Sequence, residues 1–394
     1  MRMRVRIGEI GQEVKMPEVC PYQGCGGHHF KWHQQRCEKG VRDLKHKVLE
    51  VKRCKCLKCG RTFRVYPWGV SRAQQTAALK GLSVMLYILG ISSRGVEDVL
   101  RCISDLIGMR VAVGKSTVHR NVQEAGRKSR RLQKIRREGL RGKVKVVGVD
   151  GTHVKCRGKD VVVGMVVDLL SGEELCLEVL EGEDSESLEK WLRGLMEEVG
   201  FEVIVSDDAD AYKNVADELG VEHGICRMHV TRNMLERIGR LGEELLNRSP
   251  PVPEGVGITE EQVLEDLESL LWIVQGHPAQ GRKQLEILHE RYCWAKAPKK
   301  GKRAGFWYRL RRVTLDLWDD WERYTLYRTW RGEGGERLPS TNSATERMIG
   351  WSIKERYRTM RGYKSEESIL KVSTLIGWLC RCPLNYDLAQ LSVA

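Results

Sequence analysis

The sequence predicts an α/β protein, a mixed sheet flanked by helices, with a cysteine-rich ribbon and a small helical unit in front. Three observations lead to this prediction. Two β-branched runs each end on an aspartate, strand-like runs and a helical stretch lie between them, and closely spaced cysteines occupy the first 60 residues. Glycine-bounded β-branched runs are typical of buried strands, and apolar residues three or four apart are typical of helices.

Length and composition indicate a globular chain of two or three domains, because 394 residues with 41% hydrophobic content can form more than one core. No apolar run is long enough to span a bilayer, and the charged start lacks the apolar segment of a signal peptide. We therefore expect a cytoplasmic protein, associated with the nucleoid, with no membrane partner. There, 13 cysteines are expected to be thiols or metal ligands.

Positive charge is concentrated in the N-terminal third. Residues 1–142 contain 31 Lys/Arg and 11 Asp/Glu, a net charge of +20, so the remainder carries −6 of the total of +14. A basic segment attached to a mildly acidic body indicates a module that binds a polyanion, and we expect that polyanion to be nucleic acid. The alternative is surface charge that only keeps the protein soluble. It would explain a positive net charge, but not the concentration of that charge in one third of the chain.

Two cysteine pairs in residues 1–70 predict a zinc ribbon. Cys20 and Cys25 form the first pair, and Cys56 and Cys59, followed by Gly60, form the second. Four thiolates from two close pairs can surround one structural Zn²⁺ as a tetrahedron, with a hairpin between the pairs. The wider spacing of the first pair leaves other ligands open, and these competitors are Cys37, Cys54, His28 and His29.

Residues 71–140 are predicted to form a DNA-binding helix-turn-helix. Ala, Leu, Val and Met recur at helical spacing, and Ser116 is expected to cap the recognition helix. The residues of this helix that we expect at the DNA are Lys115, His119 and Arg120, and Asn121 lies beside them. A plain helical spacer is the alternative.

The catalytic region is predicted from the order of its elements. The valine run in "GKVKVVGVDGTHVKC" predicts a strand with Asp150 at its carboxyl end, although a turn residue closing the strand is the simpler explanation of this aspartate alone. Two strands joined by "SGEE", a helix from about 185 to 199, and a strand ending in Asp207 follow. If the last strand pairs in parallel beside the first, Asp150 and Asp207 become neighbours. Asp208 and Asp210 are the alternatives to Asp207.

A third acid is expected from residues 341–363, "TNSATERMIGWSIKERYRTMRGY". As a helix, this stretch places Glu346 at the head of an inward stripe, with a basic stripe about 100° away. The basic stripe, which we expect to contact DNA, consists of Arg347, Lys354, Arg358 and Arg361. The structural alternative is a capping box, in which Ser343 and Glu346 only stabilise their own helix start. Three carboxylates could hold two Mg²⁺ (or Mn²⁺) ions about 3.5 to 4 Å apart for phosphoryl transfer.

The motifs "VDGTHVK", "VSDDADAY", "CRMHVTRN" and "TNSATERMIGWSIKERYRTMRGY" together resemble those of prokaryotic insertion-sequence DDE transposases related to the Mutator-like superfamily. This resemblance covers residues 140–385 and implies an RNase H-like fold. It implies that Asp150, Asp207 and Glu346 are the catalytic, metal-binding acids. Cys226 and His229 match a motif that lies beside the active site in that superfamily.

The resemblance also implies the organisation and activity of the chain. The core would occupy 141–236 and 339–394, with a helical insertion over 237–338 that contains six tryptophans, most of which we assign to packing. The implied function is binding of terminal inverted repeats, DNA cleavage and strand transfer, by a homo-oligomer on DNA. Two alternatives stay open: an inactive or domesticated DNA-binding regulator, and an RNase H-like nuclease without strand transfer.

Overall fold

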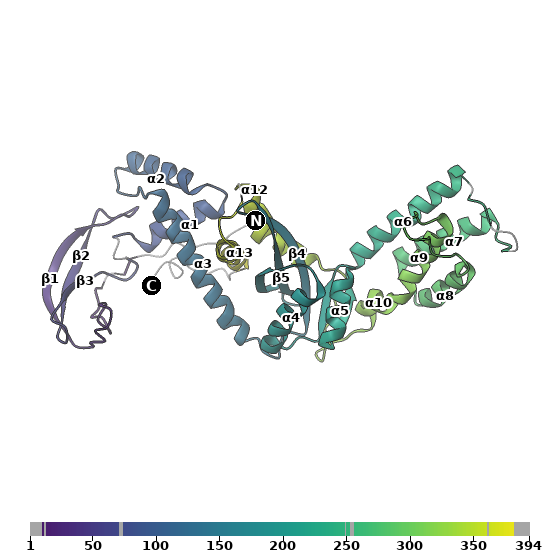
Figure 1. The fold of residues 1–394 in the computed structure, drawn as a ribbon. Coiled ribbons are helices and arrows are strands. Elements are labelled where there is room, and N and C mark those ends of the chain that lie inside the picture. The colour runs from purple at the N-terminus through teal and green to yellow at the C-terminus, as the bar shows by residue number, and fades with distance from the viewer. Residues whose placement is uncertain are drawn as a thin grey trace.

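The computed structural model describes residues 10–11, 13–70, 74–248, 250–252, 256–360 and 362–381. The first unit is a three-stranded antiparallel sheet of β1 (Phe30–Gly40), β2 (Val48–Cys56) and β3 (Thr62–Val65), in that order. It lies at one end of the elongated molecule in Figure 1. The turn after β2 closes where the N–H of Gly60 donates to the carbonyl of Cys56, with Gly60 at φ +69°, a conformation that favours glycine.

Three helices follow: α1 (Ala77–Ile88), α2 (Ser93–Ile107) and α3 (Lys115–Glu138). Ser116 is not the cap of α3, contrary to the sequence prediction. The cap residue is Gly114, and the carboxylate of Glu97 on α2 accepts the N–H of Lys115 at 2.8 Å. A neighbouring helix thus supplies the acceptor that a capping serine would have provided.

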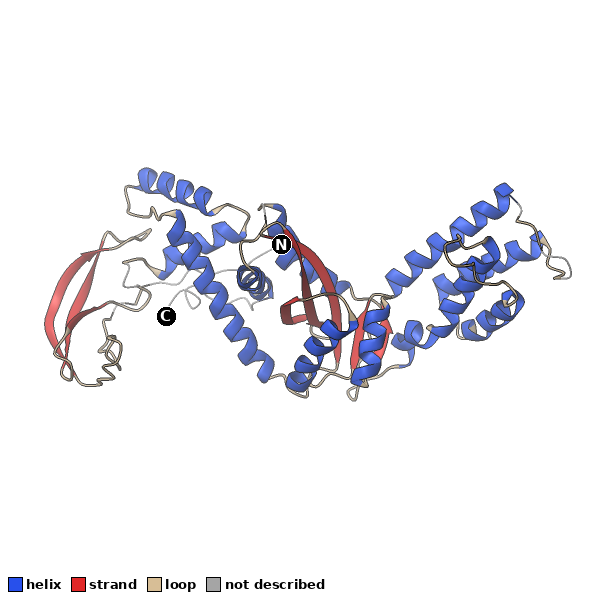
Figure 2. Cartoon of the chain, viewed as in Figure 1, coloured by secondary structure: helices blue, strands red, loops and turns tan. Residues whose placement is uncertain are grey.

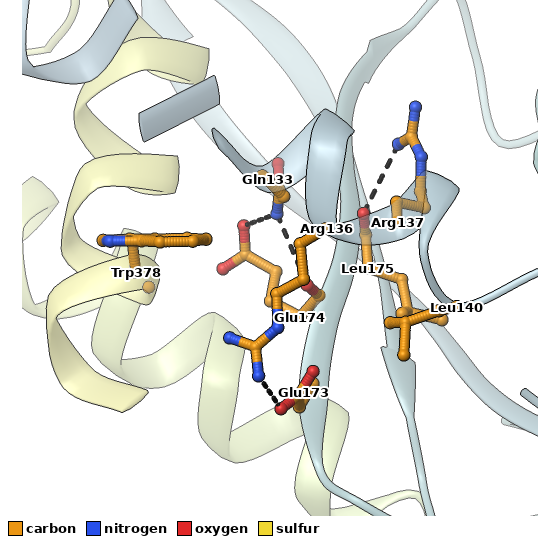
Figure 3. Close-up of a pocket in the computed structure, with 9 residues that line it drawn as sticks. Gln133, Arg136, Arg137, Leu140, Glu173, Glu174, Leu175 and Trp378 are labelled. Atoms are coloured by element: carbon orange, nitrogen blue, oxygen red, sulfur yellow. Dashed lines mark hydrogen bonds and ion pairs between the residues drawn. The ribbon is translucent and has the colours of Figure 1, made fainter. Parts of the chain in front are cut away.

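The helical unit packs onto the edge of the central sheet. In Figure 3, Gln133 of α3 donates to the carboxylate of Glu174 at 2.8 Å, and Arg136 pairs with Glu173. Trp378 of the last helix lies on the other side of this hollow, which measures only about 30 Å³. These polar contacts join α3 to the edge of the sheet.

The central sheet confirms the predicted mixed α/β class. Its strands are β4 (Val146–Cys156), β5 (Lys159–Asp168), β6 (Glu173–Leu180), β7 (Val203–Ser206) and β8 (Glu222–Ile225), in the order β6-β5-β4-β7-β8. The first three are antiparallel, whereas β7 is parallel to β4 and β8 is parallel to β7. The fourth strand therefore pairs beside the first, as predicted, and β8 adds a fifth strand.

Helices cover both faces of this sheet (Figure 2). On one face, α4 (Ser185–Val199) and α5 (Asp210–Leu219) pack against β4 through a core that includes Val147, Val149 and Leu188. On the other, the core around Met165 also takes in side chains of α1, α2, α3 and the C-terminal helices. The N-terminal helices thus share a core with the sheet.

Five helices form the insertion: α6 (Arg227–Arg248), α7 (Glu260–Gly276), α8 (Gly281–Tyr292), α9 (Phe306–Asp319) and α10 (Trp321–Thr329). They have a separate core and extend away from the sheet (Figure 1). α6 continues across the border predicted at residue 236. Five of the six tryptophans pack against apolar cores, whereas Trp272 is exposed.

The chain returns to the sheet through α11 (Ser343–Ile349), the π-helical turn η1 (Gly350–Lys354), α12 (Glu355–Arg358) and α13 (Glu366–Arg381). The helix predicted over 341–363 is therefore interrupted by a wider turn and ends earlier. Ile349 and Ile353 of its inward stripe are buried. None of the helices in the described part of the chain has the length and apolar character needed to cross a membrane.

Candidate functional site

Asp150 lies within β4, not at its carboxyl end as predicted. β5 pairs with β4 along its whole length, and Asp150 is opposite Met165 in that ladder. Because the antiparallel partner continues, the strand continues through Gly151 to Cys156. The parallel pairing with β7 stops earlier, at Gly148 opposite Val205. Asp150 therefore stands just beyond the point where the β7 ladder ends.

Asp207 is the first residue after β7. The β4–β7 register pairs Val146 with Val203 and Gly148 with Val205, and the same offset places Asp150 level with Asp207. One carboxylate oxygen of Asp207 accepts the N–H of Ala209 at 3.2 Å, which holds the turn before α5. The two aspartates thus come from neighbouring parallel strands.

Asp208 and Asp210, the two alternatives to Asp207 as the second acid, lie in different surroundings. The carboxylate of Asp208 lies 2.9 Å from the ammonium of Lys213, which also pairs with Asp320 at 2.6 Å. This network joins α5 to the insertion. The side chain of Asp210 is 92% exposed at the start of α5. These placements favour Asp207 as the second acid of the site.

Glu346 comes from α11 and does not form the capping box that was the structural alternative. The helix begins at Ser343 after Asn342, and the cap makes no side-chain hydrogen bond. The hydroxyl of Ser343 instead donates to Thr341 at 2.9 Å. The Glu346 carboxylate lies 3.7 Å from Nε2 of His229 and is 38% exposed. Its side chain is therefore directed toward another element.

Cys226 and His229 flank this third acid. Cys226 follows β8 directly, and His229 lies one turn into α6. The ligand atoms of Cys226, His229 and Glu346 all lie within 4.8 Å of one another. The neighbouring Cys226 side chain, together with the nearby Glu346 carboxylate, raises the pKa of His229 despite its partial burial. Burial acts to raise the pKa of Cys226, but hydrogen bonds from His229 and the Asn342 backbone outweigh it and lower the pKa.

Asp207 and Glu346 lie close enough to Asp150 for their negative charges to affect its pKa. Burial is the largest effect, the negative charges of Asp207 and Glu346 act in the same direction, and the pKa of Asp150 is raised to about 6. The N–H of Gly151, which donates at 2.8 Å, and His229 act in the opposite direction. Oxygen donors that repel one another at a half-buried position suit a divalent cation such as Mg²⁺.

Two residues that the sequence reasoning missed hold α11 against β4. Asn342 is buried, and its side-chain amide donates to the carbonyl of Val149 at 2.8 Å. Its backbone N–H donates to Sγ of Cys226 at 3.3 Å. At Gly148 a Cβ would lie 2.2 Å from Oγ1 of Thr345, so glycine permits the close approach. No spacing in the sequence marks either residue, since both act across the fold.

The four predicted zinc ligands converge. The ligand atoms of Cys20, Cys25, Cys56 and Cys59 all lie within 4.8 Å of one another. At Gly27 a Cβ would approach Sγ of Cys56 to 2.8 Å, so the backbone is packed tightly around the sulfurs. Backbone N–H groups, chiefly that of Cys59, lower the pKa of Cys56 to about 7. Four sulfurs in this arrangement fit Zn²⁺.

The competing ligands lie elsewhere. Sγ of Cys54 contacts Met16 and the carbonyl of Lys31, at 3.5 and 3.6 Å. Nδ1 of His28 lies 2.9 Å from the carbonyl of Glu18. Within the described residues, the four-residue sulfur cluster includes none of the competitors.

The residues predicted to contact DNA are mostly at the surface. Lys115, His119 and Arg120 are exposed on α3. Asn121 is buried and donates to Ser83 at 3.0 Å, so it serves packing between α3 and α1. Of the basic stripe, the exposed members are Arg347, Lys354 and Arg358. Arg361 lies outside the described residues. Seven residues, 108–114, separate α2 from α3, more than the short turn of a compact helix-turn-helix.

No family model matches the sequence, and no curated protein matches it. Among solved structures, the fold is similar to the HTLV-2 integrase catalytic core domain in complex with magnesium, at 16% identity and a TM-score of 0.19, over 33% of this chain and 84% of that one. The BIV integrase catalytic core domain matches at 12% identity and a TM-score of 0.18, over 49% and 90%. A simian T-cell lymphotropic virus intasome in complex with a PP2A regulatory subunit, B56 gamma, matches at 16% and 0.20, over 33% and 48%. All three TM-scores lie below 0.5, so the function must be inferred from the site itself.

Proposed function

We propose that this protein is a DDE-type DNA transposase that cleaves the ends of its element and joins them to target DNA. The proposal is supported by the β4–β7 register, which places Asp150 level with Asp207, and by the effect of the Glu346 charge, from α11, on the pKa of Asp150. Segments almost 200 residues apart in the chain thus supply one acidic site. An RNase H-like core and relatives among prokaryotic insertion sequences are part of the same proposal.

Asp150, Asp207 and Glu346 are the residues that would hold Mg²⁺ or Mn²⁺, two ions per site. Bound there, the ions would supply positive charge at the scissile phosphate and lower the pKa of an attacking hydroxyl. The protein's own contribution would be to hold three oxygen donors at a half-buried position, just beyond the point where the β4–β7 ladder ends. Bound cations would offset both the burial and the neighbouring negative charges that raise the pKa of Asp150.

The reaction consists of two in-line displacements. In the first, a water oxygen attacks the phosphorus, the bond to the 3′ oxygen breaks, and that oxygen leaves as a hydroxyl. In the second, the freed 3′-hydroxyl attacks a phosphodiester of the target, whose own 3′ oxygen leaves. Cys226 and His229 act as positioning residues, since His229 lies 3.7 Å from the Glu346 carboxylate.

DNA binding is assigned to two surfaces. The N-terminal third, with one structural Zn²⁺ and the exposed face of α3, would recognise the terminal repeats, because its charge of +20 suits a phosphate backbone. The exposed Arg347, Lys354 and Arg358 follow Glu346 along the chain and would hold the scissile strand. The proposal also includes a homo-oligomer of this chain, which would hold the two ends of the element together on the DNA.

The experiment is cleavage of a labelled inverted-repeat duplex by Glu346→Gln with magnesium or manganese. The glutamine keeps the shape but removes a ligand charge, so cleavage should fall to background while DNA binding persists. Glu355→Gln is the matched control, because Glu355 is an exposed acid on the following helix. Cleavage by Glu346→Gln at the wild-type rate would refute the role of this acid. Failure of the wild type to cleave would favour the regulator alternative.

A further inference from the structure

The loop between α8 and α9 concentrates positive charge at the surface of the insertion. Residues 294–308, which comprise this loop and the first turn of α9, include five Lys/Arg and no Asp/Glu. These five side chains, all exposed, belong to Lys296, Lys299, Lys300, Lys302 and Arg303. Like charges so close together repel one another, so the cluster disfavours the folded loop unless an anion binds it.

Several arginines of the insertion have carboxylate partners. Arg237 pairs with Asp316 at 2.8 Å, and Arg291 pairs with Asp266. Arg309 similarly pairs with Glu244. Across the described residues, no salt bridge involves any of the five loop cations. These three arginines therefore help to stabilise the insertion, whereas the five loop cations face solvent.

The loop surrounds a hollow of about 280 Å³ that combines cations with aromatic rings. Lys296, Lys299, Lys302 and Arg303 line it together with Trp294, Trp307 and Tyr308. Cations bind the phosphates of a nucleic acid strand, and aromatic rings offer faces on which an unstacked base can pack. A merely solvated charged loop would have no reason to surround aromatic rings.

Contacts beneath the loop hold the aromatic side in place. The rings of Trp294 and Trp307 lie 5.5 Å apart, and Trp307 packs edge-on against Phe306 at 4.9 Å. The indole N–H of Trp294 donates to the carbonyl of Arg291 at 2.9 Å. Arg311 donates to the carbonyl of Ala295 at 2.8 Å. The floor of the hollow is thus anchored to α8 and α9 before any ligand binds.

We propose that this basic-aromatic loop, residues 294–308, binds single-stranded nucleic acid, with phosphates on the cations and an unpaired base against the aromatic floor. A duplex fits less well, because its bases are stacked and present only their edges. That the strand is DNA rests on the proposed function. α8 and α9 lie at the opposite end of the molecule from β1, β2 and β3 (Figure 1), so the loop would hold a different segment of DNA from the N-terminal third.

The test measures binding of the full chain to a fluorescein-labelled 20-nucleotide oligothymidine and to a 20-base-pair duplex, without added magnesium. The triple variant Lys299→Gln, Lys302→Gln, Arg303→Gln should bind the single strand about ten-fold more weakly. The slope of log affinity against log salt concentration should become shallower by about 2, because each of the three lost phosphate contacts contributes about 0.7. The matched control replaces three exposed basic residues elsewhere with glutamine: Lys190, Lys283 and Arg337. It should change the affinity less than about two-fold.

Two further measurements localise the strand. Tyr308→Leu should weaken single-strand binding about five-fold or more and leave duplex binding unchanged, because it removes an aromatic face but no charge. A bromodeoxyuridine-substituted strand should crosslink to residues 294–308. Equal losses in the two triple variants, or crosslinks confined to residues 1–142, would overturn the proposal. Since no assay here requires cleavage, a failure would leave the acidic site untouched.

Discussion

Replacing Asp150 with asparagine should stabilise the metal-free protein at pH 7.5. In the folded chain, burial and the neighbouring acids raise the pKa of Asp150 from 3.8 to about 6. Each pKa unit corresponds to 1.36 kcal/mol, so ionised Asp150 destabilises the fold by about 3 kcal/mol. Asparagine carries no charge and keeps an oxygen that can accept the N–H of Gly151.

The sign of the pH dependence follows from the direction of the shift. Below pH 3.8 the group is protonated in both states, and its ionisation costs nothing. As pH rises from about 4 to about 6, the unfolded chain releases the proton first, so wild-type stability falls relative to the variant. The difference should be near zero at pH 4 and reach its full value above pH 6.

The assay compares thermal unfolding of the wild type and Asp150→Asn without added magnesium between pH 4 and 8. We expect the variant to melt several degrees higher at pH 7.5. Magnesium should then raise the melting temperature of the wild type but not of the variant. Asp105→Asn, at an exposed acid, is the control and should show neither effect. A variant less stable than the wild type at pH 7.5, or a difference independent of pH, would refute the reasoning.

Three further outcomes are expected. Purified protein should contain about one zinc per chain by metal analysis, lost in Cys56→Ser and retained in Cys54→Ser; equal zinc in both variants would exclude the assigned ligands. Asn342→Ala, which removes the donor to the buried Val149 carbonyl, should lower stability by about 1 to 3 kcal/mol in urea unfolding and slow cleavage, whereas a normal cleavage rate would show that Glu346 needs no such anchor. Arg120→Gln should weaken duplex binding and flatten its salt dependence by about 0.9, and an unchanged slope would remove α3 from the DNA contact.

The sequence was sufficient to predict those elements whose residue pattern is local and periodic. The helix predicted from about 185 to 199 is α4, Ser185–Val199, because its apolar residues recur at helical spacing and Asp184 caps it. The meander, helix and parallel strand were predictable from order alone, since a crossover of this kind returns the chain beside its first strand. The close spacing within each of the two cysteine pairs likewise predicted that the four sulfurs come together.

The tertiary structure decided what depends on a distant partner. Asp150 is not at a strand end because β5 extends the ladder, and α3 needs no capping serine because Glu97 reaches it from α2. The choice of Asp207 over Asp208 as the second acid depends on Lys213, because Lys213 pairs with Asp208. Asn342 gained its importance only when folding brought it beside Val149, 193 residues earlier in the chain. A residue's own neighbours in sequence determine its helix or strand, whereas its chemistry depends on side chains that only the packed fold brings within bonding distance.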